Sequence, residues 1–586
     1  MKKQIEPEYG EFYRLTAGRL FVIPDYQRHY SWLGRNREDM FCDILEVAAG
    51  RQDMHFMATI VCLDLADPVD IGTTRYNRIA VVDGQQRITT LVALLKAIEI
   101  RLASGGVVEK EEGAALRTWI IPDGGNNILL QTNHDGNTAY ADYLRKGTLP
   151  NAKNFLTKAD RNIHKLIVDV TEFVSDWETR SGGQPVTRLL SIIKNDITFL
   201  LQVLSEERSV YKIFEVLNSR GLPVDVLDKL KALLMGIGYD LVLGAHGDGL
   251  QIQLRQIWSE IYRAVGDGDI PGHEIVRFAA TLHDPRISSR TISSEDALEY
   301  FSSWCRSDSD TAANKKRLLD VCAWVRDVAR ALSEIHKDDA RRSVTRINQA
   351  RLLAVAINLR SDVTKDKKDR WIDAWERATF RLYGMFGKDS RSAVGVYNRL
   401  AQDVWHKRVA DRDVPKRIMD IVGDEKYSIE NALSELRDND CYTDWQPALR
   451  YMLFRIEQAL AKSEGHEIDH ALWTEIWQSR ADDTIEHILP KDPSWWNAPE
   501  WKGAFSVRKY DSRLAKVHCI GNLTILPHSQ NSKAGGKSFG DKKKIYKANP
   551  LFLHREILSL KQWTQKEIED RQERILRIAA GVWGDL

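Results

Sequence analysis

The chain has 586 residues, which is too long for one hydrophobic core, so we expect two to four domains. A formal net charge of +1 excludes a polycation, so a nucleic-acid surface would have to arise from local clusters of Lys and Arg. Six scattered cysteines without a CxxC pair argue against a zinc ribbon or a disulfide framework and favour a reducing cytoplasm. No apolar run approaches the length of a membrane span, so we expect a cytoplasmic protein with no membrane partner.

Residues 1 to about 105 have the pattern of an α/β domain. A short extended segment at 21–24 is followed by a helix at about 37–47 and a buried strand at 55–63. Between the first two lies an aromatic and polar stretch that includes Gln27 and Arg28. This stretch is either a surface loop anchored by its aromatic rings or part of a binding site.

The most informative turn joins a buried strand at 79–82 to a helix with apolar residues at helical spacing from Ile88 to Ile98. Its residues are Asp83, Gly84, Gln85, Gln86 and Arg87. A helix N-terminus attracts anions, Gly84 permits positive φ or close approach of a ligand, and Arg87 can hold a phosphate through two hydrogen bonds. The alternative is an ordinary polar turn whose side chains only cap the helix.

A second polar corner contains Asn218 and Arg220. A helix is expected to end near Asn218, and Asp225 is expected to cap the next helix at 226–235. Loops of this kind often carry binding groups, although a helix–loop–helix corner explains the pattern equally well. Residues 106–160 predict turns and short strands, 160–240 predict helices, and 240–440 predict a helical spacer.

Basic residues gather in the C-terminal region, which begins near residue 441. This density is the electrostatic pattern of a surface that binds a phosphate backbone, although lysine runs also solubilise ordinary surfaces. The candidates for DNA contact are Lys533, Lys537, Lys542, Lys543 and Lys544.

The same region contains a second set of chemically suggestive residues. Glu486 and His487 are adjacent in an apolar segment, and Asn522 and Asn531 follow. A carboxylate and an amide oxygen suit a hard divalent cation, and a neutral imidazole can activate water as a general base. Such a cation would neutralise charge at a scissile phosphate. A single histidine on an apolar segment is, however, more often structural than catalytic.

Residues 486–490, residues 521–523 and Asn531 resemble the motif of HNH (ββα-metal) nucleases. The resemblance implies that Glu486 is a metal ligand and His487 the general base. It also implies that Asn522 orients the histidine or braces its loop, and that Asn531 is the last ligand. Glu486 and Asn531 depart from the commoner residues at their positions, but both keep an oxygen ligand for Mg²⁺ or Mn²⁺.

Together with residues 23–32, 83–87 and 218–221, this motif resembles the arrangement of GmrSD-type modification-dependent restriction endonucleases. The resemblance covers about residues 10–235 and 441–560. It implies a ParB-like N-terminal domain that binds and hydrolyses a nucleoside triphosphate, with GTP favoured. The implied nucleotide site comprises Asp83, Gly84, Gln85, Gln86 and Arg87, with Gln27, Arg28, Asn218 and Arg220 assisting.

We therefore predict a predominantly helical α+β protein with three domains. These are a ParB-like sensor domain at 1–236, a helical spacer at 237–440 and an HNH nuclease domain at 441–586. The predicted function is an NTP-regulated, metal-dependent endonuclease that cuts foreign, modified double-stranded DNA in anti-phage defence, and homo-oligomerisation is left open. The alternatives are a DNA-binding regulator with a degenerate nuclease domain, and a toxin-like nuclease that acts without a modification signal.

Overall fold

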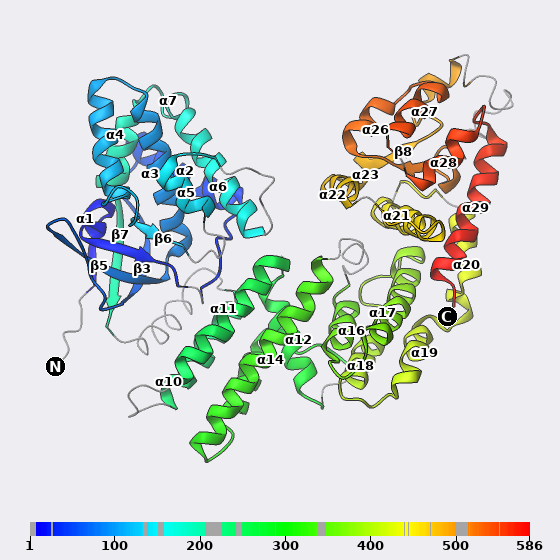
Figure 1. Cartoon of the computed structure of the whole chain (residues 1–586), viewed down its shortest axis with the longest axis horizontal. Coiled ribbons are helices and arrows are strands. Elements are labelled where there is room, and N and C mark those ends of the chain that lie inside the picture. The colour runs from blue at the N-terminus through cyan, green and yellow to red at the C-terminus, as the bar shows by residue number, and fades with distance from the viewer. Residues whose placement is uncertain are drawn as a thin grey trace. The chain divides into compact units, whose positions relative to one another are not determined.

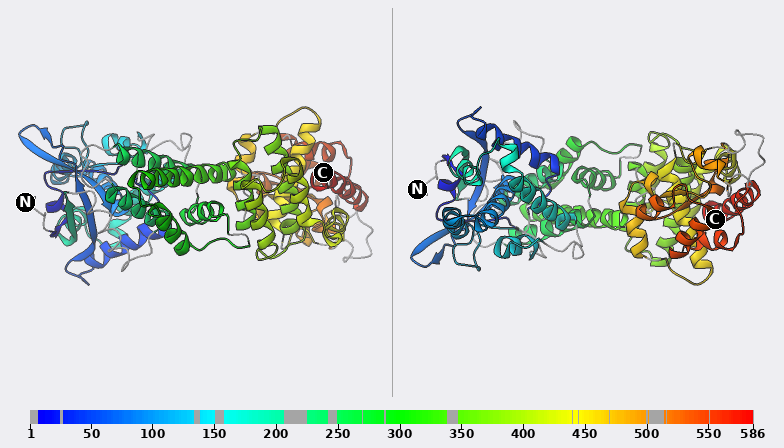
Figure 2. Two further views of the ribbon diagram at one scale, coloured as in Figure 1. Left: turned by 90° about the horizontal axis from the view of Figure 1, so that it is seen from below. Right: turned by 90° about the horizontal axis from the view of Figure 1, so that it is seen from above.

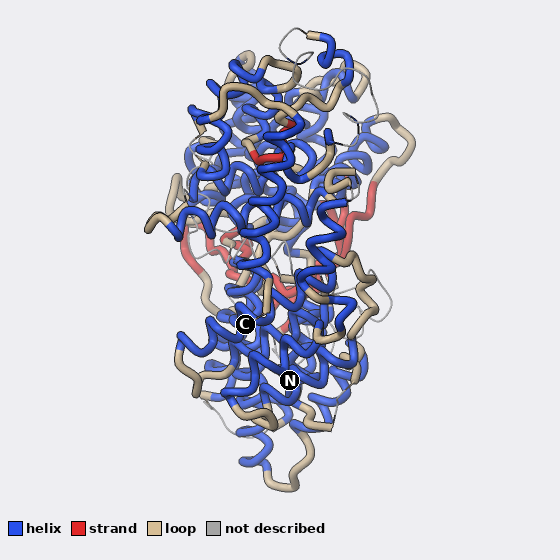
Figure 3. Tube along the Cα trace, turned by 90° about the vertical axis from the view of Figure 1, so that its right-hand side faces the viewer, coloured by secondary structure: helices blue, strands red, loops and turns tan. Residues whose placement is uncertain are grey.

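The computed structural model confirms a predominantly helical α+β chain with one small mixed sheet, as Figure 3 shows. It divides into two compact units, which are residues 1–280 with 292–333, and residues 281–291 with 334–586. The predicted division into three domains stays a prediction. The structure describes residues 7–24, 27–132, 138–149, 158–205, 225–241, 249–268, 270–286, 289–337, 347–438, 440–443, 445–468, 470–498, 501, 514, 516–549 and 551–585.

The first unit is built on a mixed sheet with the strand order β1-β7-β3-β5-β2-β6, in which β4 also pairs with β5. Pairs β7–β3, β5–β2 and β2–β6 are parallel, whereas β1–β7, β3–β5 and β4–β5 are antiparallel. The strands are β1 (Glu8–Glu11), β2 (Arg19–Val22), β3 (His55–Asp64), β4 (Val69–Ile71), β5 (Thr74–Asp83), β6 (Leu130–Gln131) and β7 (Ile197–Leu204).

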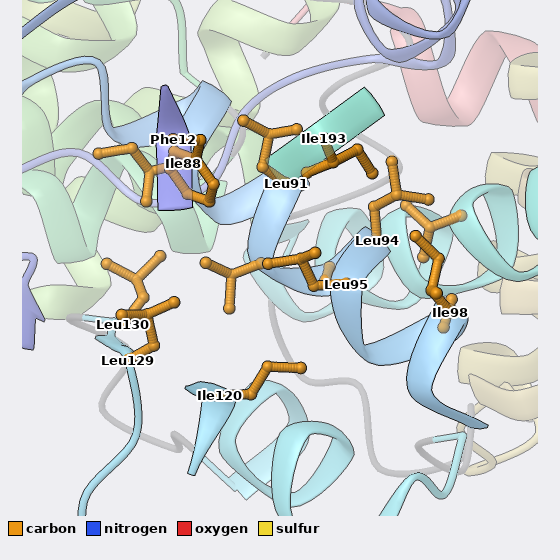
Figure 4. Close-up of a cluster of buried hydrophobic side chains, with 14 of the residues drawn as sticks. Phe12, Ile88, Leu91, Leu94, Leu95, Ile98, Ile120, Leu129, Leu130 and Ile193 are labelled. Carbon is orange, nitrogen blue, oxygen red and sulfur yellow. The ribbon is translucent and has the colours of Figure 1, made fainter. Parts of the chain in front are cut away.

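The helix that follows β5 lies at the centre of the hydrophobic core of this unit. Helix α3 (Gln85–Ala103) is apolar on nearly all sides, which is the pattern of a buried helix. Ile88, Leu91 and Leu95 are fully buried, and Figure 4 shows α3 side chains packed near those of Ile120 and Leu130. This packing fixes the N-terminal end of α3, where the predicted nucleotide turn lies.

Figures 1 and 2 show the helices of the first unit in blue to green. They are α1 (Phe12–Thr16), α2 (Gly34–Ala48), α3, α4 (Val107–Ile120), α5 (Thr138–Lys146), α6 (Lys158–Ser175), α7 (Trp177–Arg180), α8 (Val186–Ser191), a π-helix (Ile192–Asp196), α10 (Val226–Asp240), α11 (Leu250–Gly268), α12 (Gly272–His283), α13 (Ser294–Cys305) and α14 (Thr311–Lys337). The predicted cap of α10 is confirmed, because the Asp225 carboxylate accepts a hydrogen bond from the N–H of Leu227 at 2.8 Å.

Two sequence predictions in this unit are wrong. Residues 107–120, expected among turns and short strands, form α4, whose apolar face packs on α3. Residues 197–204, expected to be helical, form β7 in the middle of the sheet. β7 has apolar residues on both faces, with Phe199 and Leu201 on its fully buried face and Leu200 and Leu204 on its partly exposed face, and such a run does not distinguish a strand from a helix.

The described residues of the second unit are helical apart from one pair of short strands. Its helices are α16 (Asn348–Leu359), α17 (Lys365–Thr379), a π-helix (Phe380–Met385), α18 (Val394–Trp405), α19 (Val414–Met419), α20 (Ile429–Asp438), α21 (Gln446–Ser463), α22 (His470–Gln478), α23 (Ala481–Thr484), α26 (His528–Ala534), α27 (Phe539–Ala548), α28 (Phe552–Ser559) and α29 (Gln565–Trp583), with short 3-10 turns at Asp411–Asp413, Asp420–Val422, Glu425–Tyr427, Pro493–Asn497 and Ile520–Asn522. The strands are β8 (Ile485–His487) and β9 (Leu523–Ile525). Among the helices that the structure describes, none combines the length and apolarity needed to cross a bilayer.

Candidate active site

The predicted site residues lie on strand β8, in the 3-10 turn that precedes strand β9, and on the helix that follows β9. Strand β8 pairs with β9 in the register Glu486↔Thr524 and His487↔Leu523. Helix α26 begins three residues after β9 and contacts β8. Because successive side chains of a strand point to opposite faces, Glu486 and His487 lie on opposite sides of β8.

His487 is enclosed by aromatic rings on one side of β8. Its Nε2 lies 3.0 Å from Nδ1 of His518, and the edge of its ring meets Tyr442, with the centroids 4.5 Å apart. Burial, followed by the facing His518 imidazole, lowers the pKa of His487 well below its ordinary value. The imidazole is therefore neutral at neutral pH, which is the protonation state that a general base requires.

Glu486 lies on the opposite, buried side. Its Oε1 accepts hydrogen bonds from Nζ of Lys542 at 2.6 Å and from the hydroxyl of Tyr546 at 3.1 Å. Lys542 also donates to the carbonyl of His487 at 2.7 Å and has no exposed surface. Burial raises the pKa of Glu486 and lowers that of Lys542, and the pairing offsets part of both shifts.

This arrangement does not fit two of the predicted roles. The carboxylate of Glu486 is occupied by an internal ammonium group, so the side chain is not presented as a metal ligand on the His487 face. Lys542 cannot contact DNA from a fully buried position, and its place in the structure corrects that prediction. Glu486 and Lys542 instead form a buried ion pair with each other.

Asn522 is completely buried and braces the loop that follows β8. Its Oδ1 accepts from the N–H of Leu489 at 2.7 Å and from Nε1 of Trp563 at 3.0 Å. Its Nδ2 donates to the carbonyls of Leu489 and Val517, at 3.1 and 2.8 Å. With both ends of the amide engaged by the protein, Asn522 supports the site and does not face a reacting group.

Helix α29 holds the other strand of the pair. The buried guanidinium of Arg571 donates through Nη1 to the carbonyls of Gly521 and Leu523, both at 2.8 Å. Gly521 has no room for a side chain, since a Cβ there would lie 2.2 Å from the carbonyl oxygen of Ile568. The closeness of these backbones explains the glycine before Asn522.

Asn531 lies on α26, half-buried, with its Nδ2 donating to the carbonyls of Asp483 at 2.8 Å and Ile485 at 3.3 Å. Nδ1 of His528 lies 3.9 Å from the carboxylate of Asp483. Burial, followed by the Asp482 and Asp483 carboxylates, raises the pKa of Tyr442, which places these acids near the ring that contacts His487. Within the described ranges, no three His, Cys, Asp or Glu side chains are close enough to share a metal ion.

The other predicted DNA contacts differ in their surroundings. Lys533 and Lys537 are exposed beside the turn after α26. Lys544 is exposed and pairs with Asp541 at 2.7 Å, whereas Lys543 donates to the carbonyl of Leu560 at 2.8 Å. Lys533, Lys537 and Lys544 therefore remain accessible to a phosphate backbone.

In the first unit, the predicted nucleotide turn joins β5 to α3. Gly84 is the residue before α3 and has a φ of 91°, a conformation that favours glycine. The carboxylate of Asp83 accepts from the N–H of Gly84 at 2.8 Å. Burial raises the pKa of Asp83, and the hydrogen bond from Gly84 and the nearby Arg87 and Arg28 partly offset that shift.

The glutamines in and beside this turn differ in their hydrogen bonds. Gln86 accepts from the N–H of Ser31 at 2.8 Å and donates to the carbonyl of His29 at 3.2 Å, so it holds the preceding polar loop against α3. Gln27 donates from that loop to the carbonyl of Val82 at 3.3 Å. Gln85 is also buried, and its Oε1 has no hydrogen-bond partner among the described residues.

The two arginines have different partners. Arg87 lies 6.0 Å from the centroid of the Trp32 ring, at the outer limit of a cation–π contact. Arg28 lies 3.6 Å from the carboxylate of Asp228 on α10, so this arginine pairs with an acid of the same unit. The structure thus brings Asp83 to Arg87 together with Gln27 and Arg28. Asn218 and Arg220 lie outside the described residues.

Sequence reasoning missed the structural roles of several residues around the nuclease-like site. Phe539, Lys542 and Tyr546 are the buried residues of α27, and their helical spacing was a signal that Lys542 faces inward. Arg571 occupies the buried face of α29 in the same way. No sequence signal indicates the contact between His518 and His487, because it joins residues 31 positions apart.

Comparison with known proteins identifies the family. No curated protein matches the chain. The family model described as the GmrSD restriction endonuclease N-terminal domain matches residues 10–235. The model described as the C-terminal domain of GmrSD restriction endonucleases matches residues 427–578. The first match contains the turn at Asp83–Arg87 and the second contains His487, Asn522 and Asn531, and together they span more than half of the chain. The chain belongs to the family of GmrSD restriction endonucleases.

Proposed function

We propose that this restriction endonuclease is an HNH-type enzyme that hydrolyses phosphodiester bonds in foreign, modified DNA and is controlled by a nucleoside triphosphate. The observation that carries the nuclease type is the position of His487, which is a neutral imidazole on the first strand of a β8–β9–α26 unit, with Asn531 on the helix. This is the strand–strand–helix arrangement in which the ββα-metal motif places its base and its last ligand.

In the proposed reaction, Nδ1 of His487 takes a proton from a water molecule, and the water oxygen forms a bond to phosphorus. The bond from phosphorus to the leaving oxygen breaks, and that oxygen takes a proton from solvent. Lys533, Lys537 and Lys544 hold the DNA backbone by charge. Asn522 acts only by bracing the loop after the base.

A required Mg²⁺ or Mn²⁺ ion is part of the proposal, but Glu486 does not fit as its ligand. The groups that contact one another between α23 and α26 include the Asp483 carboxylate and the His528 imidazole, and the Asn531 amide donates to the carbonyl of Asp483. The carboxylate and amide oxygens of Asp483 and Asn531 suit a hard cation, which would supply charge neutralisation at the scissile phosphate. The affinity for Mn²⁺ should fall in Asp483→Asn and stay unchanged in Glu486→Gln. The opposite result would restore Glu486 as a ligand.

The nuclease assignment is tested with supercoiled plasmid. His487→Ala should lower the cleavage rate by about 10²- to 10⁴-fold, the usual contribution of a general base, while the Kd for DNA stays unchanged. The exposed His466 is the matched control, and His466→Ala should cut at the wild-type rate. Full activity of His487→Ala would exclude His487 as the base.

The Asp83–Arg87 turn is the proposed nucleotide site. It offers the N-terminus of a long buried helix, a glycine at positive φ and a partly exposed guanidinium, which together suit a phosphate chain. Asp83→Ala and Arg87→Ala should abolish NTP turnover or remove its control of cleavage, with GTP assayed first. Arg75→Ala, which breaks an exposed pair with Asp70, is the control. Unchanged turnover and cleavage in both variants would remove this turn from the mechanism.

A second candidate function is that of a DNA-binding regulator with an inactive nuclease domain. The observation that favours it is the buried pairing of Glu486 with Lys542, which leaves that carboxylate unavailable on the reaction face. Metal-dependent plasmid nicking separates the two functions. Parallel digestion of RNA, unmodified DNA and modified phage DNA separates the restriction function from that of a toxin-like nuclease.

A further inference from the structure

His518 lies directly against the proposed general base. It comes from the segment before the 3-10 turn Ile520–Asn522, and its Nδ1 lies 3.0 Å from Nε2 of His487, which is hydrogen-bonding distance. The two rings are nearly perpendicular, at 80°, with their centroids 5.1 Å apart. The contact therefore joins the nitrogen of His487 that is distal to its backbone to the proximal nitrogen of His518.

Both the backbone and the ring of His518 are held in place. Its carbonyl accepts a hydrogen bond from the N–H of Cys441 at 3.1 Å. Its ring stacks on Tyr442 with a centroid separation of 5.2 Å and an interplanar angle of 10°. Tyr442 also meets His487 edge-on, so one tyrosine supports both imidazoles. A half-buried histidine fixed in this way is suited to holding a neighbouring group in one orientation.

The contact also couples the tautomers of the two rings. A neutral imidazole has one nitrogen that donates and one that accepts, so a single proton lies between Nε2 of His487 and Nδ1 of His518. If His518 donated that proton, His487 would carry its own proton on Nδ1 and could not accept one from water. If His487 donates through Nε2, its Nδ1 lone pair stays free for the reaction.

We propose that His518 is a positioning residue that accepts the Nε2 proton of His487 and thereby keeps Nδ1 of His487 unprotonated and correctly aimed. This inference rests on the proposed nuclease function, and it assigns His518 no contact with the substrate. A comparable partner orients the base in other hydrolytic sites, where loss of the orienting group lowers kcat and leaves binding intact.

The test compares three variants of the full chain on supercoiled plasmid. His518→Phe keeps the ring that stacks on Tyr442 but removes the acceptor, so kcat should fall on the order of 10- to 100-fold with little change in KM. His518→Asn restores a short acceptor and should recover part of the loss, which a merely structural role would not explain. His466→Phe replaces an exposed histidine of the same unit and should leave kcat unchanged.

A readout without catalysis accompanies the kinetics. In protein labelled with ¹⁵N in the histidine rings, the resonances that disappear in His487→Ala identify His487, and they should report a proton on Nε2. His518→Phe should shift His487 toward a mixture of tautomers. Equal kcat for His518→Phe and wild type, or an unchanged tautomer, would overturn the inference while leaving the nuclease intact. A wild-type protein that cuts no DNA would instead refute the proposed function.

Discussion

Replacing Lys542 with Met should destabilise the β8 region by about 3–5 kcal/mol, the usual effect of removing one partner from a buried ion pair. The side chains of Lys542 and Glu486 are 0% and 4% exposed, so neither gains compensation from water. Without the ammonium, Glu486 loses its cationic partner and keeps the neutral Tyr546 hydroxyl at 3.1 Å, and the carbonyl of His487 loses a donor. The variant should therefore unfold locally around β8 and α27 far more often than the wild type.

Hydrogen–deuterium exchange of peptides covering β8 and α27 measures this effect in the intact chain. The predicted loss corresponds to exchange faster by on the order of 10²- to 5 × 10³-fold. Glu486→Leu combined with Lys542→Met removes both charges and should regain most of the protection, because an apolar pair avoids an unpaired buried carboxylate. The exposed Lys544 lies on the same helix, and Lys544→Met should change exchange very little. Exchange in Lys542→Met within about tenfold of wild type, or a double variant no better than the single, would refute the ion-pair reasoning.

Three further predictions concern stability. Asn522→Ala leaves two buried N–H donors without their acceptor and should lower the free energy of unfolding by about 2–4 kcal/mol in urea titrations, whereas a loss below about 0.5 kcal/mol would contradict the bracing role. Burial lowers the pKa of His554 to about 4. Since the unfolded residue titrates near ~6.5, stability should fall by up to about 3 kcal/mol as the pH drops from ~6.5 to ~4. His554→Phe should flatten that slope in urea titrations at a series of pH values, and an unchanged slope would exclude His554 as its cause. Gly84→Ala forces a side chain into a φ of 91° and within 3.3 Å of Ile60, so thermal unfolding should show a loss of about 1–2 kcal/mol, larger than that of Gly72→Ala, whose added Cβ meets no atom within 4 Å.

The local elements were the most predictable part of the fold. Apolar spacing, which is a local signal, predicts the strand β3 and the turn from β5 into α3. A capping residue, Asp225, predicts the start of α10. β7 was mistaken for helix because its sequence has apolar residues on both the buried and the partly exposed face, which hides the alternation of a strand. What failed was therefore the assignment of an element whose environment is set by distant parts of the chain.

The candidate site shows the same limit. The resemblance to the ββα-metal motif directed attention to Glu486, His487 and Asn531, which the structure places on strand β8 and helix α26. Adjacency in sequence suggested that Glu486 and His487 share a site, but a strand sends neighbouring side chains to opposite faces. Lys542 was grouped with the basic surface on composition, although its helical spacing from Phe539 and Tyr546 predicts burial. The position of His518 depends on tertiary packing alone.

The two faces of β8 carry different groups, with His487 on one and the buried Glu486–Lys542 ion pair on the other, and this arrangement suggests why the ion pair is there. A base must be held to within a fraction of an ångström of its productive position, yet two-stranded sheets are marginally stable by themselves. The pair β8–β9 is only three residues long, so its own hydrogen bonds cannot supply that rigidity. Lys542 on α27 and Arg571 on α29 each bind a carbonyl of this sheet and tie it to a long or well-packed helix. Weakening either contact should lower kcat before it lowers the affinity for DNA, because Lys542 and Arg571 are fully buried and position His487 without reaching the DNA.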